Sequence, residues 1–196
     1  CFPPVIVDTH GAAIGRSREN KISVPNDDSL LEEGHARIYP EGGVFFIEGC
    51  GARHGVSMRV TAGPGLQDWL LDVGVVFVAG LTEFTVTGVT SKQLEIQVTG
   101  GPALGQQILV NTAGATIGRS TDNTCTVGDK ELSRRHCCVE YDPREGNFFL
   151  CDVGSTNGSY VRMCGPYHGR LGLQFGDHIM VGRTAFSVNR CVTQIV

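Results

Sequence analysis

The second half of the chain repeats the first, and this duplication limits the folds that the chain can adopt. Residues 12–17 (AAIGRS) recur 103 positions later as residues 115–120 (ATIGRS), and residues 45–47 (FFI) recur as residues 148–150 (FFL). A period of about 100 residues is too long for a solenoid repeat, so the sequence predicts a duplicated domain. Other matches follow in the same order: Val24 with Val127, His35 with His136, Gly51 with Gly154, Gly55 with Gly158, and Phe84 with Phe186.

The repeat predicts two domains of similar size, residues 1–91 and residues 92–196. A strand-like pattern over residues 94–99 (LEIQVT) begins almost where the first copy ends, which leaves a very short linker of about residues 91–93. Such a short tether restricts the relative orientations of two domains. Residues 92–103 have no counterpart at the start of the first copy, so we expect the opening strand of the first domain to be missing.

Composition and local patterns predict an all-β fold. The 196 residues include 27 glycines, about twice the usual share, which favours many tight turns. Leu94, Ile96 and Val98 alternate with polar residues at the two-residue period of a strand. No long stretch shows the three- and four-residue spacing of an amphipathic helix. Short strands joined by glycine-rich turns are typical of β-sandwiches, so we expect two tandem β-sandwich domains.

The charge distribution and the hydropathy argue against two classes of partner. The net charge is −4, which provides no general attraction for the phosphates of a nucleic acid. Counted by halves, residues 1–91 carry a net charge of −5 and residues 92–196 a net charge of +1, so an anion would prefer the second half. The longest apolar uncharged stretch, residues 73–81, is far shorter than the ~20 residues that cross a bilayer. We therefore expect neither a nucleic-acid partner nor a membrane.

The cysteines favour a reducing compartment over a metal site. The chain has eight cysteines but no C-x-x-C motif, and their spacing fits neither a zinc ribbon nor a zinc finger. Cysteines of this kind pack as small apolar residues in reduced proteins. We expect no metal, no cofactor and an intracellular location, in the cytoplasm or the nucleus.

Three short motifs of the second copy resemble the signature of the forkhead-associated (FHA) domain family. They are residues 118–119 (GR), residues 133–136 (SRRH) and residues 154–158 (GSTNG). The family signature contains Gly-Arg, then Ser-x-x-His, then a loop around Ser-Thr-Asn, in the same order. The resemblance implies a β-sandwich whose loops at one end bind a phosphothreonine peptide.

The chemistry of phosphothreonine suits the residues of these motifs. The phosphate carries about −1.5 to −2 charges at pH 7, and a planar guanidinium can bind two of its oxygens at once. We assign this role to Arg119. The resemblance implies that Ser133 donates its hydroxyl to the phosphate and that Arg134 approaches the same group. It also implies that Thr156 lies beside the phosphate and that Asn157 forms hydrogen bonds with the peptide backbone.

Four further residues of the motifs are expected to support the site without touching the ligand. The resemblance implies that His136 ties the binding loop together. Gly118, Gly154 and Gly158 allow tight backbone paths.

The first copy keeps the frame of the signature and loses much of its chemistry. It retains Gly15, but Glu32 and Glu33 stand where the second copy has serine and arginine, and residues 52–54 (ARH) replace Ser-Thr-Asn. Two carboxylates would repel a phosphate dianion by a few kcal/mol at an effective dielectric constant near 20. We expect the first domain to be a degenerate FHA-like scaffold. A changed ligand is the alternative, because Arg16 and the arginine and histidine of the replaced loop remain as donors.

The sequence predicts a non-catalytic module that recognises phosphothreonine-containing partner proteins through the second domain. Ser133 and His136 lie in one short segment, with no Gly-x-Ser-x-Gly elbow and no obvious carboxylate to orient the histidine, so a nucleophilic site is not supported. The chain also lacks a Walker-type phosphate loop. The alternative function is a phosphate-independent module for protein assembly.

Overall fold

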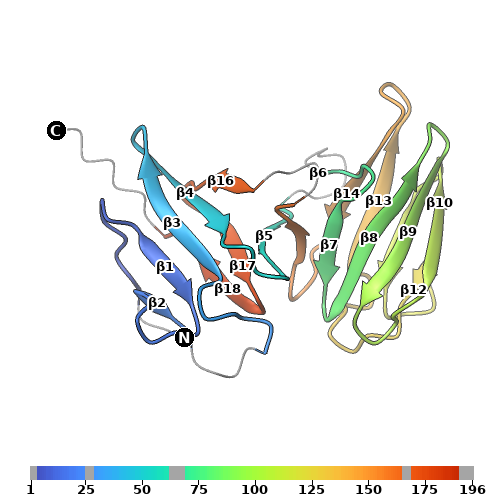
Figure 1. Ribbon diagram of the computed structural model, residues 1–196. Coiled ribbons are helices and arrows are strands. Elements are labelled where there is room, and N and C mark those ends of the chain that lie inside the picture. Colours follow the sequence, from blue (N-terminus) through green and yellow to red (C-terminus); the bar gives the residue numbers. More distant parts are fainter. Residues whose placement is uncertain (1–3, 25–28, 62–68, 165–168, 190–196) are drawn as a thin grey trace. The chain divides into compact units, whose positions relative to one another are not determined.

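The described part of the protein consists of strands and turns. The computed structural model describes residues 4–24, 29–61, 69–164 and 169–189, and within these residues no helix occurs (Figure 1). None of the described segments is therefore a helix that could span a membrane. The prediction of an all-β fold is confirmed.

The chain divides into two compact units. Unit 1 comprises Cys1–Met58 and His168–Val196, and unit 2 comprises Arg59–Tyr167. Each unit contains two sheets, and we describe the units separately.

Unit 1 has one sheet of five strands and one of three. In spatial order the larger sheet is β16-β4-β3-β1-β2, and the smaller sheet is β5-β17-β18. The strands are β1 (Ala12–Gly15), β2 (Ile22–Ser23), β3 (Ala36–Glu41), β4 (Val44–Gly49), β5 (Val56–Arg59), β16 (Arg170–Gly172), β17 (His178–Val181) and β18 (Thr184–Ser187).

Unit 2 has five strands in each sheet. Their spatial orders are β10-β9-β8-β7-β15 and β12-β11-β13-β14-β6. The strands are β6 (Trp69–Leu70), β7 (Val76–Ala79), β8 (Thr82–Val89), β9 (Gln93–Gly100), β10 (Gln107–Asn111), β11 (Ala115–Gly118), β12 (Cys125–Thr126), β13 (Cys137–Asp142), β14 (Asn147–Asp152) and β15 (Ser159–Arg162).

A single apolar core joins the two sheets of unit 2. Phe77 and Phe84 on neighbouring strands are fully buried, with stacked rings whose centroids are 4.7 Å apart. They belong to the same buried cluster as Ile117, Val139 and Leu150 of the opposite sheet. Alternate residues of each strand therefore face the partner sheet, which is the packing of a β-sandwich. The predicted sandwich architecture is confirmed for this unit.

Each unit combines strands from both copies of the repeat. In unit 2, β7 of the first copy pairs with β15 of the second, and β6 pairs with β14. In unit 1, β16 and β17 of the second copy pair with β4 and β5 of the first. The last strands of each copy thus complete the sheets that the other copy begins.

The compact units and the repeat divide the chain at different places. Residues 91–93, expected as a linker, form the tight turn of the β8–β9 hairpin inside unit 2, where the backbone N–H of Thr90 donates to the carbonyl of Gln93 at 2.8 Å. The predicted boundary between residues 91 and 92 comes from the sequence repeat and stays a prediction. The two compact units are defined by contacts between residues, so their boundaries lie elsewhere. Within the described residues, unit 1 has no counterpart of the β9–β10 hairpin.

Candidate functional site

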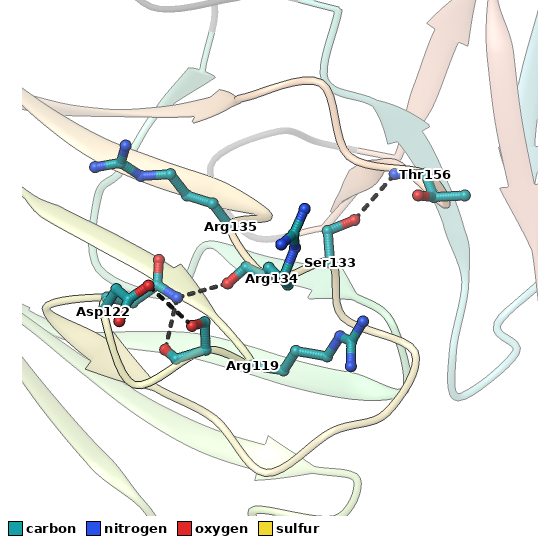
Figure 2. Close-up of a pocket in the computed structure, with 8 residues that line it drawn as sticks. Arg119, Asp122, Ser133, Arg134, Arg135 and Thr156 are labelled. Carbon is teal, nitrogen blue, oxygen red and sulfur yellow. Dashed lines mark hydrogen bonds between the residues drawn. The ribbon is translucent and has the colours of Figure 1, made fainter.

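Three loops of unit 2 surround a polar hollow of about 610 Å³ (Figure 2). The first loop follows β11, the second precedes β13, and the third connects β14 to β15. The residues that line the hollow are Arg119, Ser120, Asp122, Asn123, Ser133, Arg134, Arg135 and Thr156.

Backbone hydrogen bonds fix the first two loops to each other, and Ser133 fixes the third. The N–H groups of Arg119 and Ser120 donate to the carbonyls of Ser133 and Arg134, both at 3.1 Å. The Ser133 Oγ accepts a hydrogen bond from the backbone N–H of Thr156 at 3.1 Å. Because that oxygen is used as an acceptor, its own O–H remains a donor for a ligand. The structure thus brings together four of the five predicted binding residues.

The hollow is rich in positive charge. Arg119, Arg134 and Arg135 line it, together with a single carboxylate, that of Asp122. Among the residues that the structure describes, the guanidinium groups of Arg119 and Arg134 form no ion pair. In Figure 2 the Arg119 side chain extends toward the side where Ser133 and Thr156 lie, whereas Arg135 extends the opposite way. Unpaired arginines facing solvent are suited to bind an anion with several oxygens.

Gly118 permits the close approach of β11 to the second loop. A Cβ at this position would lie 2.3 Å from the carbonyl oxygen of Arg134 and 2.9 Å from Nδ2 of Asn123. The Asn123 side chain bridges the loops, since its Nδ2 donates to the carbonyls of Ser120 and Arg134 at 2.8 and 2.6 Å. The predicted supporting role of Gly118 has a steric reason.

His136 connects the second and third loops as a neutral imidazole. Its Nδ1 accepts a hydrogen bond from the backbone N–H of Ser133 at 3.0 Å, so Nε2 carries the proton and donates to the carbonyl of Gly158 at 3.1 Å. The ring is fully buried, and this burial lowers its pKa, although the Gly158 carbonyl opposes the shift. His136 therefore holds the two loops together, and both of its ring nitrogens are used within the protein.

Asp152 organises the third loop, a role that the motifs did not predict. Its carboxylate accepts five hydrogen bonds of 2.7–2.9 Å from the backbone of Gly154 and from the backbone and hydroxyl groups of Ser155 and Ser159. Burial by itself would raise the pKa of Asp152, but these hydrogen bonds outweigh it and lower the pKa. The Asp-x-Gly-Ser pattern, which is typical of an Asx turn, could have predicted this role from the sequence.

The glycines of the third loop have positive φ angles. Gly154 and Gly158 have φ values of 84° and 81°, a region that side chains with a Cβ rarely adopt. A Cβ at Gly158 would also lie 2.7 Å from Nε of Arg59. Both glycines thus permit the path of the loop.

Asn157 departs from the other predicted binding residues, because it does not line the hollow. Its side-chain Nδ2 donates to the carbonyl and to a carboxylate oxygen of Glu131, at 3.0 and 3.3 Å. The side chain is exposed beside the site. A peptide would have to share this amide with Glu131 or displace that residue.

The corresponding loops of unit 1 form the same hydrogen bonds, but a carboxylate replaces the serine hydroxyl. The backbone N–H of Glu32 donates to Nδ1 of His35 at 3.1 Å, and His35 Nε2 lies 2.8 Å from the carbonyl oxygen of Gly55. The Arg16 N–H donates to the carbonyl of Glu32. Here the Glu32 carboxylate accepts the N–H of Arg53 at 2.9 Å, as the Ser133 hydroxyl does for Thr156.

Several residues that line the hollow, and Glu131 beside it, were not predicted as site residues. The adjacent Arg134 gave a signal for Arg135, because the two form a basic pair. For Ser120 and Asn123 the signal was the repeat, since Ser17 and Asn20 occupy the matching positions of the first copy. Asp122 and Glu131 gave no signal, because their places depend on loop conformation.

Comparison with known proteins finds a matching family model and several relatives. A family model described as "FHA domain" matches residues 115–182. The oxoglutarate dehydrogenase inhibitor of Corynebacterium efficiens is 37% identical over 83 residues, which are 42% of this chain and 56% of that protein. The chain thus spans little more than half the length of this relative. The FHA domain-containing protein FhaB of Mycolicibacterium smegmatis is 34% identical over 67 residues, 34% of this chain and 42% of that protein.

A longer match extends over 119 residues. The glycogen accumulation regulator GarA of Mycolicibacterium smegmatis is 33% identical in this stretch, which covers 59% of this chain and 72% of that protein. The match to the family model includes Gly118, Ser133, His136 and the loop of residues 154–158. The chain therefore belongs to the FHA-domain family.

Proposed function

We propose that the hollow of unit 2 binds a phosphothreonine-containing segment of a partner protein and that the chain is a non-catalytic recognition module. The observation that supports this proposal is the convergence of Arg119, Ser133, Arg134 and Thr156 from three loops around one polar hollow. The two arginines that approach the phosphate lack internal ion pairs among the described residues, so they are available to a dianion.

Each residue has a defined role in this proposal. Arg119 binds two phosphate oxygens through its guanidinium, and Arg134 adds a second positive charge. Ser133 donates its O–H to the phosphate while its oxygen holds the backbone of Thr156. Thr156 contacts the phosphothreonine, and Asn157 binds the peptide backbone after releasing Glu131. No step requires a metal or a cofactor.

The names of the relatives support a role in regulation. One relative is an inhibitor of oxoglutarate dehydrogenase and another is a regulator of glycogen accumulation. We propose that this chain likewise acts on other proteins by binding them, with a phosphorylated threonine as the recognised mark.

We further propose that the repeat is a tandem pair of FHA-like domains in sequence, residues 1–91 degenerate and residues 92–196 with the intact signature. The Glu32 carboxylate occupies the place of the Ser133 hydroxyl and already accepts the N–H of Arg53. A phosphate at this position would meet a second anion. We infer that the loops of unit 1 bind no phosphate and that their retained frame has a scaffold role.

The test is a titration with three versions of one peptide, containing phosphothreonine, phosphoserine or threonine. We expect the phosphothreonine peptide to bind most tightly, the phosphoserine peptide several-fold more weakly because a buried methyl group contributes about 0.8 kcal/mol, and the threonine peptide not to bind. Affinity for the phosphothreonine peptide should fall below about pH 6, where the phosphate takes up a proton. Equal affinity for all three peptides would instead favour the phosphate-independent assembly module.

A further inference from the structure

Two cysteines face each other on the sheet of unit 2 that carries the binding loops. Cys138 on β13 and Cys151 on β14 are directly opposite in the antiparallel register. Their neighbours Cys137 and Leu150 belong to the apolar core. Since successive side chains of a strand point to opposite faces, Cys138 and Cys151 lie together on the outer face of this sheet.

The distances at this pair fit a covalent bond between the sulfurs. Directly opposed residues of antiparallel strands have Cα atoms about 4.5–5.5 Å apart, inside the range of about 4.4–6.8 Å found for disulfides. The two Sγ atoms, together with a carboxylate oxygen of Glu140, all lie within 4.8 Å of one another. The Cys138 and Cys151 side chains are also joined by a hydrogen bond. The strand register is therefore compatible with a disulfide between these cysteines.

Cys138 differs in acidity from Cys137 and Cys151, because the hydrogen bond to Cys138 and burial raise the pKa of Cys151. The hydrogen bond from Cys151 lowers the pKa of Cys138, and the positive charge of Arg135 acts in the same direction. Burial raises the pKa of Cys137, whose side chain faces the core. The thiolate is the form that reacts with oxidants, so Cys138 is the more reactive of the two adjacent cysteines.

Cys138 is the less buried of the two cysteines, with 8% of its surface exposed. It lines a second hollow of about 530 Å³ on unit 2, together with Thr116, Arg135 and Glu140. Cys151 is fully buried. A small oxidant would therefore meet Cys138 first and leave Cys151 to react with the product.

We propose that Cys138 and Cys151 form a reversible dithiol site that a hydroperoxide such as hydrogen peroxide oxidises to a cross-strand disulfide. The Cys138 thiolate attacks one peroxide oxygen, the O–O bond breaks, and the released hydroxide takes up a proton to become water, leaving a sulfenic acid on Cys138. The Cys151 sulfur then attacks the Cys138 sulfur, the S–O bond breaks, and the hydroxide leaves as water with the thiol proton. Two thiols lose two electrons, and one peroxide becomes two molecules of water.

The proposed disulfide would lie next to two of the three loops that surround the hollow. Cys138 lies two residues after His136, which holds the second loop, and Cys151 directly precedes Asp152, which organises the third. The bond ties together the two strands from which these loops emerge. This inference concerns the cysteines alone and does not depend on phosphopeptide binding.

The experiment treats the full chain with one equivalent of hydrogen peroxide, blocks the remaining thiols by alkylation and analyses tryptic peptides by mass spectrometry. We expect a disulfide between the peptide of residues 136–144, which contains both Cys137 and Cys138, and the peptide of residues 145–162, which contains Cys151. Dithiothreitol should reverse it. Cys138→Ser and Cys151→Ser should each abolish the link, whereas Cys137→Ala should preserve it.

Cys50→Ser, which removes an exposed cysteine in unit 1, is the matched control and should leave the yield of the link unchanged. A link that survives in Cys138→Ser, or oxidation of Cys138 to sulfinic acid without a link, would overturn the proposal. Stoichiometric zinc in the purified protein that is lost on Glu140→Gln would also overturn it, because the three donor atoms would then form a metal site.

Discussion

Arg119 and Arg16 occupy matching positions of the repeat and form matching backbone hydrogen bonds, but their neighbours differ in charge. Both arginines donate their backbone N–H to the residue at the first motif position of the next loop, which is Ser133 in unit 2 and Glu32 in unit 1. The serine leaves the field of Arg119 positive, whereas the glutamate supplies a negative charge in the space that a phosphate would need. In our proposal, this one difference in side chain separates an anion site in unit 2 from loops of unit 1 that bind no anion.

Replacing these two arginines tests the assignment. We expect Arg119→Ala to weaken phosphothreonine peptide binding by at least tenfold, since a hydrogen bond to a charged group contributes about 1.5–3 kcal/mol, while the thermal unfolding midpoint stays unchanged because the guanidinium has no internal partner among the described residues. Arg16→Ala is the matched control and should leave the affinity unchanged. Isothermal titration calorimetry on both variants gives the answer. A loss of binding in Arg16→Ala would show that unit 1 takes part.

The repeat and the family pattern agree on two polar residues of the predicted site, Arg119 and His136. They did not predict the contacts of Asn157, because its hydrogen bonds with Glu131 depend on how two loops of different sequence approach each other. The residue type at a motif position shows which hydrogen bonds a side chain can form. Which partner it binds depends on the conformation of the loops, and this conformation cannot be read from a single sequence.

At the level of a loop, Asp152 makes the third binding loop sensitive to acid. Its pKa lies below the ordinary value of 3.8 in the folded protein, so the unfolded chain takes up a proton first as the pH falls. The stabilisation is therefore complete above about pH 4 and is lost as the pH falls through the folded-state pKa. Acid should loosen the loop that carries Thr156 before it affects the core.

Asp152→Asn removes this dependence. We expect the variant to be less stable at pH 7 by about 2–3 kcal/mol, because an amide cannot accept all the donors that face the carboxylate, and we expect the difference from the parent protein to shrink between pH 4 and pH 2. Urea unfolding followed by tryptophan fluorescence at a series of pH values measures both. A constant difference across this range would show that the Asp152 carboxylate is not the titrating group. Asp142→Asn on the neighbouring strand is the control.

At the level of a strand, the alternation of apolar and polar residues predicted both the strand over residues 94–99 and the face that is buried. Leu94, Ile96 and Val98 were expected on one side of a strand, and all three are buried in β9. The pairing partners were not predicted, because the two copies have nearly the same pattern in the strands that close each sandwich. The Phe-Thr-Val of β8 and the Phe-Ser-Val that begins in β18 fit the same place in a sheet.

At the level of the whole chain, one ion pair depends on the exchange of strands between the two copies. Arg162 on β15 forms an ion pair with Glu83 on β8, and only 13% and 22% of these side chains are exposed. By the offset of the repeat, the counterpart of Glu83 in the second copy is Ala185. If each copy closed on its own strands, Arg162 would face this alanine and have no charge to pair with. The ion pair is therefore specific to the exchanged arrangement.

A double-mutant cycle on this ion pair tests the exchange directly. We expect Glu83→Gln and Arg162→Met each to lower the free energy of unfolding, because each removes one member of a largely buried ion pair and leaves the charge of the other poorly solvated. The double variant should lose less than the sum of the two, with a coupling of about 1–3 kcal/mol, since it removes both charges together. The same cycle with Ala185→Ser in place of the Glu83 change is the control and should show no coupling. Additive effects of Glu83→Gln and Arg162→Met would contradict the exchange and would favour copies that close within residues 1–91 and 92–196.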